Sequence, residues 1–428
     1  MNTSGSARSI VPHDSEQWLV TVMVTSFVVA VAAIWIEIRG LNLSTPLLAT
    51  SATCLTLLKR WAWNWWLAVP FVFIAAGHIL NNLVHDTPYR PLSFGARLVV
   101  ICVTAQIGFS IARLLADRVT PAWPATIIII GGFSLASTLD GTNLPLEAVR
   151  LLRGGTINTY LNAVFKSATD AVDRVVDVTM HFSNVRDGPT ATLLLLSGLV
   201  IWQGTRRQLQ LILPLLAVAI LFSLSRSAWL AAAIPIVLAA AWQARTWLTR
   251  RRFTFVGVTL AVVALVAAPI VGGVVIKRSG GSQDESAEVR TSAARDAITV
   301  IRRHLWDGAG YRFNANTAPH NLVLDAGLLG GVIAMIGAIM LAGLGVWTLL
   351  RGARSIVRTR DPTLDPRAAL GATTLASLTS ARVFVSGDPF TDLAMWGSLG
   401  LAIGILSISI RGDIPARRPW SYRPRSEP

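Results

Sequence analysis

The sequence predicts an all-α polytopic membrane protein with about twelve transmembrane helices. Of the 428 residues, 53% are hydrophobic and only 14% are charged, whereas an ordinary soluble domain carries about 25% charged residues. Apolar runs near twenty residues long recur from Trp18 to Ile410, and a helix needs about twenty apolar residues to cross the hydrocarbon core. These observations exclude a soluble globular enzyme.

The predicted crossings follow from the apolar runs, taken in order along the chain. Their centres fall near residues 27, 50, 74, 103, 131, 196, 215, 235, 264, 335, 375 and 399. They form a transmembrane bundle over residues 18–410, between tails of residues 1–17 and 411–428. The first apolar run is not followed by a small-residue cleavage site, so we expect a retained helix and not a removed signal peptide.

The charge pattern predicts the orientation of the chain. The formal net charge is +15, and the basic residues gather between the apolar runs, as with Lys59 and Arg60 or Arg206 and Arg207. Cytoplasmic loops of membrane proteins carry such an excess of Lys and Arg. Both tails are therefore predicted to be cytoplasmic. Because the membrane accounts for the basic residues, we expect membrane lipid and no nucleic acid as a partner.

The sequence lacks the usual motifs of disulfide-linked, metal-dependent, nucleotide-binding and serine-nucleophile proteins. Cys54 and Cys102 both fall inside apolar runs, which indicates neither a disulfide framework nor a zinc site. The sequence contains no Asp-x-Asp metal motif, no Gly-rich phosphate loop, no His-Glu-x-x-His motif and no Gly-x-Ser-x-Gly nucleophile elbow. We therefore expect no cofactor and no metal in the site.

Two predicted outer loops are too long to be simple connections. Residues 141–189 contain apolar positions at three- and four-residue steps from Ile157 to Thr179, which predicts an amphipathic helix. We expect this helix to lie on the outer membrane surface or to cover the bundle; the alternative is that it packs against its own loop. Residues 277–319 begin with a flexible polar stretch from Lys277 to Ser286 and continue as a helix from Glu288 to Arg303.

Arginines at the outer rim are candidates for binding an anionic substrate. Ionisable residues at membrane depth are energetically costly, so their presence there indicates a functional role. Arg226 lies where one apolar run meets the next, and its guanidinium suits bidentate contact with a phosphate. The alternative is an arginine that only marks the interface. Arg290 lies in the predicted helix of the second loop, where the alternative is a solvated face.

Histidines supply candidates for a general base. Pro319 suggests the first position of a helix, which places His320 in the first turn, where the helix dipole favours a neutral imidazole. A neutral imidazole can accept a proton. The alternative is that His320 is only a polar residue at the helix end, with its side chain hydrogen-bonded to the backbone.

A second group of polar residues shares one face at the outer end of the third crossing: His78, Asn81, Asn82 and His85. Interhelical hydrogen bonding also explains these amides.

The order of these residues resembles the O-antigen ligase and O-antigen polymerase superfamily of bacterial membrane glycosyltransferases. The resemblance covers about residues 207–345 and rests on four stretches: Leu224-Ser225-Arg226-Ser227-Ala228-Trp229, Glu288-Val289-Arg290, Trp306-Asp307-Gly308-Ala309-Gly310-Tyr311 and Pro319-His320-Asn321-Leu322. One departure is the short spacing from His320 to Gly327-Leu328-Leu329-Gly330. Alternatively, Gly331 takes the place of the family glycine.

The resemblance implies a GT-C-like fold in the bacterial inner membrane, with a multi-pass chain and a periplasmic active site. It implies an inverting, metal-independent transfer of glycan from a polyprenyl-diphosphate carrier to a glycolipid or polysaccharide acceptor. Arg226, Arg290 and His320 resemble the essential residues of the family and are the predicted catalytic residues. Substrate binding is assigned to both arginines together with Asn321, His78 and Arg382, the last of these near the outer end of the eleventh crossing.

The same residues leave other functions open. Ligases and polymerases of this superfamily share both arginines and the histidine, so a polymerase of lipid-linked repeats is one alternative. A transporter or flippase also has about twelve helices, but its site would lie near the bilayer midplane. A non-catalytic scaffold of envelope assembly is a further alternative.

Overall fold

The computed structural model describes the helical bundle and part of its connections. The described residues are 13–32, 37–38, 41–42, 44–85, 91–115, 187–204, 209–210, 212–214, 216–217, 220, 230–240, 283–310, 321–357, 365–385, 390 and 392–410. Within them, the all-α prediction is confirmed. The helices are α1 (His13–Ala32), α2 (Ser44–Leu57), α3 (Trp65–His85), α4 (Pro91–Leu115), α8 (Asp187–Gln203), α12 (Gln283–Arg303), α13 (Leu322–Val357), α14 (Pro366–Val385) and α15 (Leu393–Ile410). Strands β1 (Glu37–Ile38) and β2 (Leu41–Asn42) form a short antiparallel pair.

Three of the described helices are long and apolar enough to cross a membrane. They comprise Trp65–His85, Phe94–Leu115 and Leu322–Ile356. Shorter apolar helices occur at Glu16–Val31, Leu193–Gln203, Leu230–Ala240 and Leu393–Ile408. The crossings predicted near residues 131 and 264 lie outside the described residues, as does the amphipathic helix predicted from Ile157. The total of about twelve crossings therefore stays a prediction.

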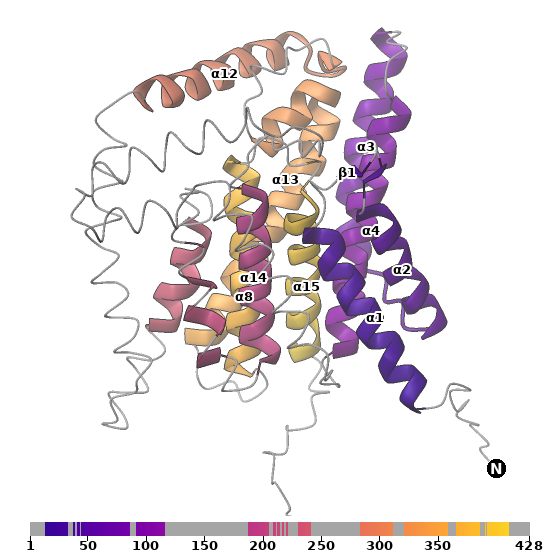
Figure 1. The fold of residues 1–428 in the computed structure, drawn as a ribbon. Coiled ribbons are helices and arrows are strands. Elements are labelled where there is room, and N and C mark those ends of the chain that lie inside the picture. Colours follow the sequence, from indigo (N-terminus) through magenta and orange to yellow (C-terminus); the bar gives the residue numbers. More distant parts are fainter. Residues whose placement is uncertain are drawn as a thin grey trace, which may run out of the picture.

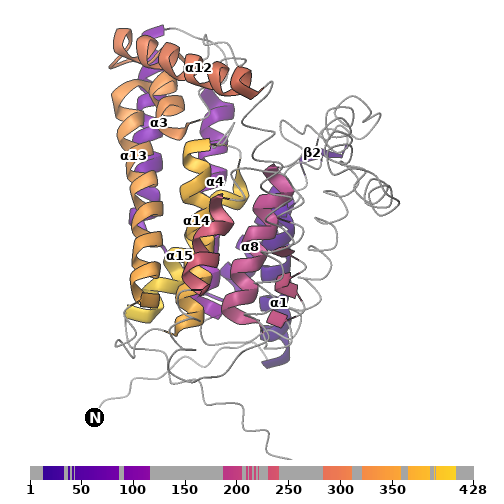
Figure 2. The ribbon, with the colours of Figure 1, turned by 90° about the vertical axis from the view of Figure 1, so that its left-hand side faces the viewer.

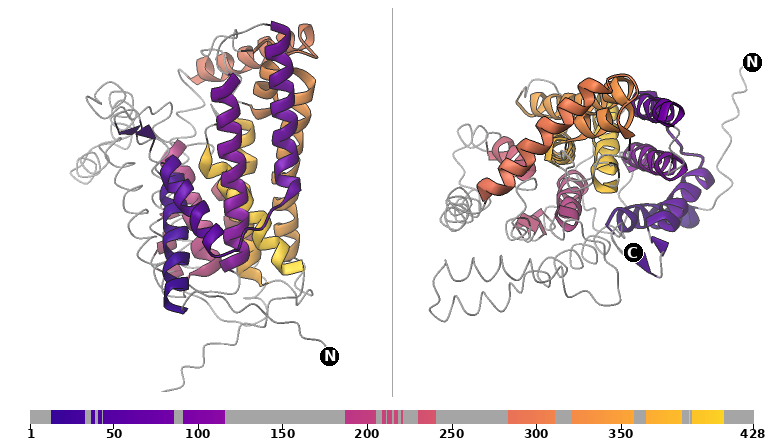
Figure 3. Two further views of the ribbon diagram at one scale, coloured as in Figure 1. Left: turned by 90° about the vertical axis from the view of Figure 1, so that its right-hand side faces the viewer. Right: turned by 90° about the horizontal axis from the view of Figure 1, so that it is seen from above.

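Small residues allow the helices of the bundle to pack closely, as is common in membrane proteins. A Cβ atom at Gly400 of α15 would meet the backbone of Ala105 on α4, and one at Gly77 of α3 would meet Gly330 and Ala334 of α13. The views in Figure 1 and Figure 3 show these helix pairs side by side. The bundle core between them is apolar, with Trp396 among its largest fully buried side chains.

Helix α12 lies across one end of the bundle, next to the beginning of α13 (Figures 1 and 2). We refer to this end as the α12 end; the beginning of α1 lies at the opposite end (Figure 1). One face of α12 is buried, and its Ala297 and Ile301 pack with Leu328 of α13. The opposite face exposes charged side chains, including Arg295 and Arg302. This amphipathic pattern explains why the helix lies on the bundle and does not enter it.

Helix α12 begins earlier than the sequence predicted. The polar stretch from Lys277 to Ser286 was expected to be flexible, but the helix already begins at Gln283. The predicted end at Arg303 is confirmed.

Candidate functional site

The structure describes the predicted catalytic residues only in part. Arg226 and His320 lie outside the described residues. Of Arg290, the structure describes the backbone, which lies in the first half of α12. The geometry of the site is therefore built from the residues around these three positions.

Asn321 forms the N-cap of α13. Its side-chain oxygen accepts hydrogen bonds from the backbone N–H groups of Val323 at 3.0 Å and Leu324 at 3.3 Å. Such a side chain satisfies N–H groups that have no partner within the helix. Since α13 begins at Leu322, the prediction that Pro319 occupies the first helical position is wrong. Asparagine is a strong N-cap residue, and it fixes the start of α13 at Leu322, three residues after the proline.

Helix α13 is interrupted at Gly330 and Gly331. Their backbone angles are non-helical, with φ −151° and ψ 23° at Gly330 and φ 64° and ψ −156° at Gly331. The conformation of Gly331 is one that only glycine adopts readily. Breaks of this kind leave N–H and C=O groups of the helix without partners inside the helix. The chain segment before α13 supplies hydrogen-bond partners for these groups.

Residues 304–310, which we call the 304–310 loop, cover this break. The N–H of Val332 donates to the carbonyl of Leu305 at 2.7 Å, and the N–H of Ala309 donates to the carbonyl of Leu328 at 2.8 Å. Gly308 has a φ of 68°, and a Cβ atom there would lie 2.8 Å from the backbone nitrogens of both Gly330 and Gly331. Gly308 of the Trp-Asp-Gly-Ala-Gly stretch thus permits backbone-to-backbone contact with α13.

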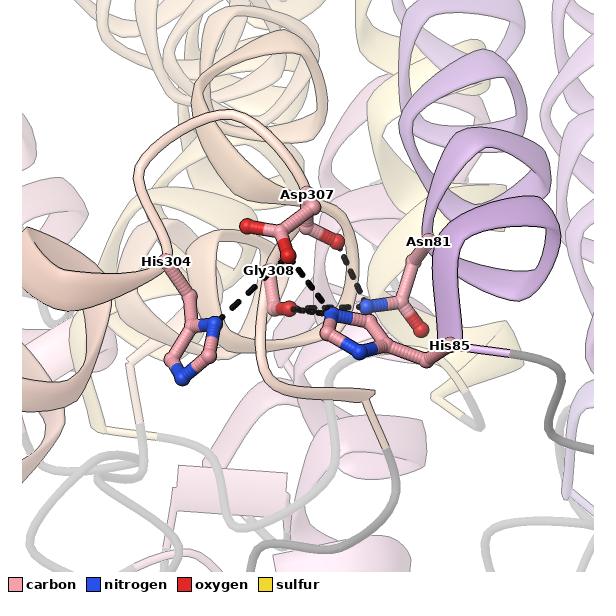
Figure 4. A network of polar contacts seen from close by, with 5 residues as sticks. All are labelled: Asn81, His85, His304, Asp307 and Gly308. Atoms are coloured by element: carbon pink, nitrogen blue, oxygen red, sulfur yellow. Dashed lines mark hydrogen bonds and ion pairs between the residues drawn. The ribbon is translucent and has the colours of Figure 1, made fainter.

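Helix α3 holds the same loop from the other side (Figure 4). The side-chain amide of Asn81 donates to the carbonyls of Asp307 at 2.5 Å and Gly308 at 2.9 Å. The ring nitrogen Nε2 of His85 lies 3.0 Å from the carbonyl of Gly308. Asn81 is buried, with 1% of its surface exposed. Segments more than 200 positions apart, on α3 and after α12, are therefore joined at the α12 end.

Two histidines surround the carboxylate of Asp307 (Figure 4). Its Oδ2 lies 2.7 Å from Nε2 of His85 and 3.5 Å from Nδ1 of His304. Burial raises the pKa of Asp307, but a backbone hydrogen bond, the hydrogen bond to His304 and the charges of both histidines outweigh it, so the pKa is lowered. The carboxylate is therefore ionised at neutral pH.

The predicted substrate-binding residues His78 and Arg382 are buried among protein groups. The ring of His78 packs on the ring of Phe94, with ring centroids 4.4 Å apart. The ring of Phe94 in turn packs edge-on against that of Phe390, with ring centroids 5.3 Å apart. Arg382, at the end of α14, forms an ion pair of 2.5 Å with Asp392, just before α15. Asp392 also accepts a hydrogen bond from the N–H of Met395. These contacts hold α3, α4, α14 and α15 together near the site.

The sequence did not predict two residues that form ion pairs at the site, His304 and Asp392. His304 and Asp392 were not among the predicted site residues, although Asp307 lay in a recognised motif. The spacing of His304 and Asp307, three positions apart, was the available signal, but the third member, His85, is remote in sequence. Of the group on α3, Asn81 and His85 contact the 304–310 loop, whereas the amide of Asn82 donates to the carbonyl of His78 within its own helix.

Comparison with known proteins identifies the domain that contains this site. No curated protein matches the chain in sequence. A protein-family model described as O-antigen ligase matches residues 211–339. The matched segment contains Arg226, α12 with Arg290, the 304–310 loop, His320 and the beginning of α13. Residues 211–339, which contain this site, therefore form a domain of the O-antigen ligase family.

Proposed function

We propose that the protein is an inverting, metal-independent glycosyltransferase of the O-antigen ligase type. It transfers a glycan from a polyprenyl-diphosphate carrier to a glycolipid or envelope polysaccharide on the outer face of the bacterial inner membrane. The observation that carries the proposal is the family match over residues 211–339, which includes Arg226, Arg290 and His320 together. Helix α12, which contains Arg290, packs on α13 through Ala297, Ile301 and Leu328. Helix α13 begins two residues after His320.

Arg226 and Arg290 bind the diphosphate of the donor in this proposal. Guanidinium groups form charge-assisted, bidentate hydrogen bonds with phosphate, and they stabilise the negative charge that grows on the leaving group. The exposed face of α12 adds the positive charges of Arg295, Arg302 and Arg303, which favour approach of an anionic carrier.

His320 acts as the general base. It removes the proton from an acceptor hydroxyl while the hydroxyl oxygen attacks the anomeric carbon from the side opposite the diphosphate. The new glycosidic bond forms as the bond from the anomeric carbon to the diphosphate oxygen breaks, and that oxygen keeps the electron pair. Asn321, which caps α13, fixes the point at which the chain leaves His320 and enters the helix.

His78 and Arg382 shape the surroundings of the site in this proposal. Both side chains are buried, with exposures of 3% and 8%, and both contact neighbouring helices. We therefore assign them to holding the helix ends around the substrate. Substitution of either is expected to lower thermal stability together with activity, whereas substitution of His320 is expected to lower activity alone.

A liposome experiment separates the enzyme from the flippase alternative. Purified protein is reconstituted with a polyprenyl-diphosphate saccharide in one leaflet only and with acceptor in the same compartment. A transferase forms the acceptor-linked product. Movement of the lipid-linked saccharide to the other leaflet without product would instead support a flippase and contradict the proposal.

Donor binding tests the role of Arg290. Arg290→Ala is expected to weaken affinity for a polyprenyl-diphosphate saccharide, because the variant loses a charge-assisted contact worth about 1.5–3 kcal/mol, or about 10- to 150-fold. Arg60→Ala is the control, since Arg60 is exposed in the segment before α3 and is not among the arginines proposed to attract the carrier. An unchanged affinity of the Arg290 variant would show that this residue does not bind the donor.

The glycolipids of a deletion strain distinguish ligase from polymerase. Loss of all attached glycan, with accumulation of long lipid-linked chains, indicates a ligase. Attachment of a single repeat indicates a polymerase. We propose the ligase and expect the first result.

A further inference from the structure

We propose that His85, His304 and Asp307 form a binding site for a divalent transition metal ion, for which Zn²⁺ is the best fit. This site goes beyond the proposed glycan transfer, which uses Arg226, Arg290 and His320. It joins the end of α3 to the 304–310 loop and thereby fixes the chain between α12 and α13.

The geometry of the three side chains suits a small ion. One nitrogen or oxygen atom from each side chain lies within 4.8 Å of the other two. In a tetrahedral zinc site with bonds of about 2.0–2.1 Å, neighbouring ligand atoms are about 3.3 Å apart. The distances from Asp307 Oδ2, 2.7 Å to His85 and 3.5 Å to His304, lie on either side of that value. Coordination by Nε2 of His85 would replace its contact with the carbonyl of Gly308, and shifts of the side chains would bring all three atoms to bonding distance.

The donor atoms select the class of metal. Two imidazoles and one carboxylate are typical ligands of zinc and other first-row transition metals, whereas Mg²⁺ and Ca²⁺ prefer oxygen ligands. The exposed fractions of the side chains are 20% for His85, 41% for His304 and 25% for Asp307. An ion can therefore reach the group from solvent, and a water molecule can complete the tetrahedron.

The surrounding hydrogen bonds hold the ligands in place before an ion binds. Asn81 holds the carbonyls of Asp307 and Gly308, and the N–H of Gly308 donates to the carbonyl of His304 at 2.8 Å. The turn that presents His304 and Asp307 is thus ordered by groups other than the ligands.

Zinc titration of the purified full-length protein tests this site. The protein is purified without a histidine tag, treated with a chelator, freed of it and titrated with zinc chloride alone by calorimetry and in a thermal unfolding assay. We expect one ion bound per chain and a melting temperature that rises with zinc. His304→Gln and His85→Gln are each expected to weaken binding at least about 10-fold.

Matched controls keep this test decisive. Arg303→Gln changes the exposed neighbour of His304 and is expected to bind zinc as the wild type does. Because His304 is partly exposed, its variant is expected to fold, which the elution volume in size-exclusion chromatography checks. Cobalt chloride gives a second readout, since tetrahedral Co²⁺ has intense visible absorption bands that the His304 variant should lose.

The result that would overturn the site is zinc binding that is absent in the wild type or unchanged in both histidine variants. That result would leave the glycan-transfer proposal intact, because transfer is measured separately and depends on other residues. Conversely, loss of transfer in a His320 variant that still binds zinc at the wild-type level would leave the metal site intact.

Discussion

The contact between the 304–310 loop and the break in α13 leaves no room for a side chain at Gly331. A Cβ atom there would lie 2.6 Å from the carbonyl oxygen of Trp306 and 2.7 Å from that of Leu305. Gly331→Ala places this atom in the structure and also forces alanine into a left-handed conformation with φ 64°. We expect the loop to separate from α13.

The expected loss of stability follows from two terms. A non-glycine residue in such a backbone conformation costs about 1–3 kcal/mol, and overpacking against a backbone that cannot move freely costs about 1–3 kcal/mol more. The sum, about 2–6 kcal/mol, is a large part of the 5–15 kcal/mol that stabilises a typical protein. Gly331→Ala is therefore expected to lower both the melting temperature and the rate of glycan transfer.

The control lies on the same helix. A Cβ atom at Gly343 would meet nothing within 4 Å, so Gly343→Ala is expected to leave stability unchanged or to raise it by up to about 1 kcal/mol. Thermal unfolding of both detergent-solubilised variants measures the difference. If Gly331→Ala melted at or above the temperature of Gly343→Ala, the described contact between loop and helix would be wrong.

Three further substitutions test the contacts around the site by thermal unfolding. Asn81→Leu removes the donor to two loop carbonyls and should cost about 2–4 kcal/mol; a melting temperature equal to that of the wild type would contradict this. Arg382→Gln leaves Asp392 buried without its ion-pair partner and should cost about 3–5 kcal/mol, whereas the double variant with Asp392→Asn should recover part of the loss. Gly400→Ala should separate α15 from α4 and cost about 1–3 kcal/mol, but Gly95→Ala, where a Cβ atom meets nothing, should not.

Hydrophobicity predicted the helical class and the three spans that the described residues contain, because the membrane imposes a simple rule on sequence. A helix that crosses lipid satisfies its own backbone and needs a long apolar run, so the runs around residues 74, 103 and 335 correspond to α3, α4 and α13. Helix α12 was also predicted, because its charged and apolar residues alternate at helical spacing. The family resemblance over residues 207–345 is confirmed by the matching segment 211–339.

Details of the site that depend on backbone geometry could not be predicted. The start of α13 was misplaced because Pro319 and Asn321 are both favourable near a helix start, and only the hydrogen bonds of Asn321 decide between them. The break at Gly330 and Gly331 could not be predicted, since consecutive glycines favour close helix packing and a helix break alike. The group around Asp307 depends on His85, whose distance in sequence leaves no local pattern to recognise.

The rate of glycan transfer by a His320→Ala variant tests the central proposal most directly. Wild-type and variant proteins are reconstituted with the same polyprenyl-diphosphate saccharide and acceptor, and product formation is followed alongside donor affinity. Loss of the general base is expected to slow transfer by about 10²- to 10⁴-fold while donor affinity stays at the wild-type value. Transfer by the variant at the wild-type rate would contradict the assignment of His320 and the mechanism built on it.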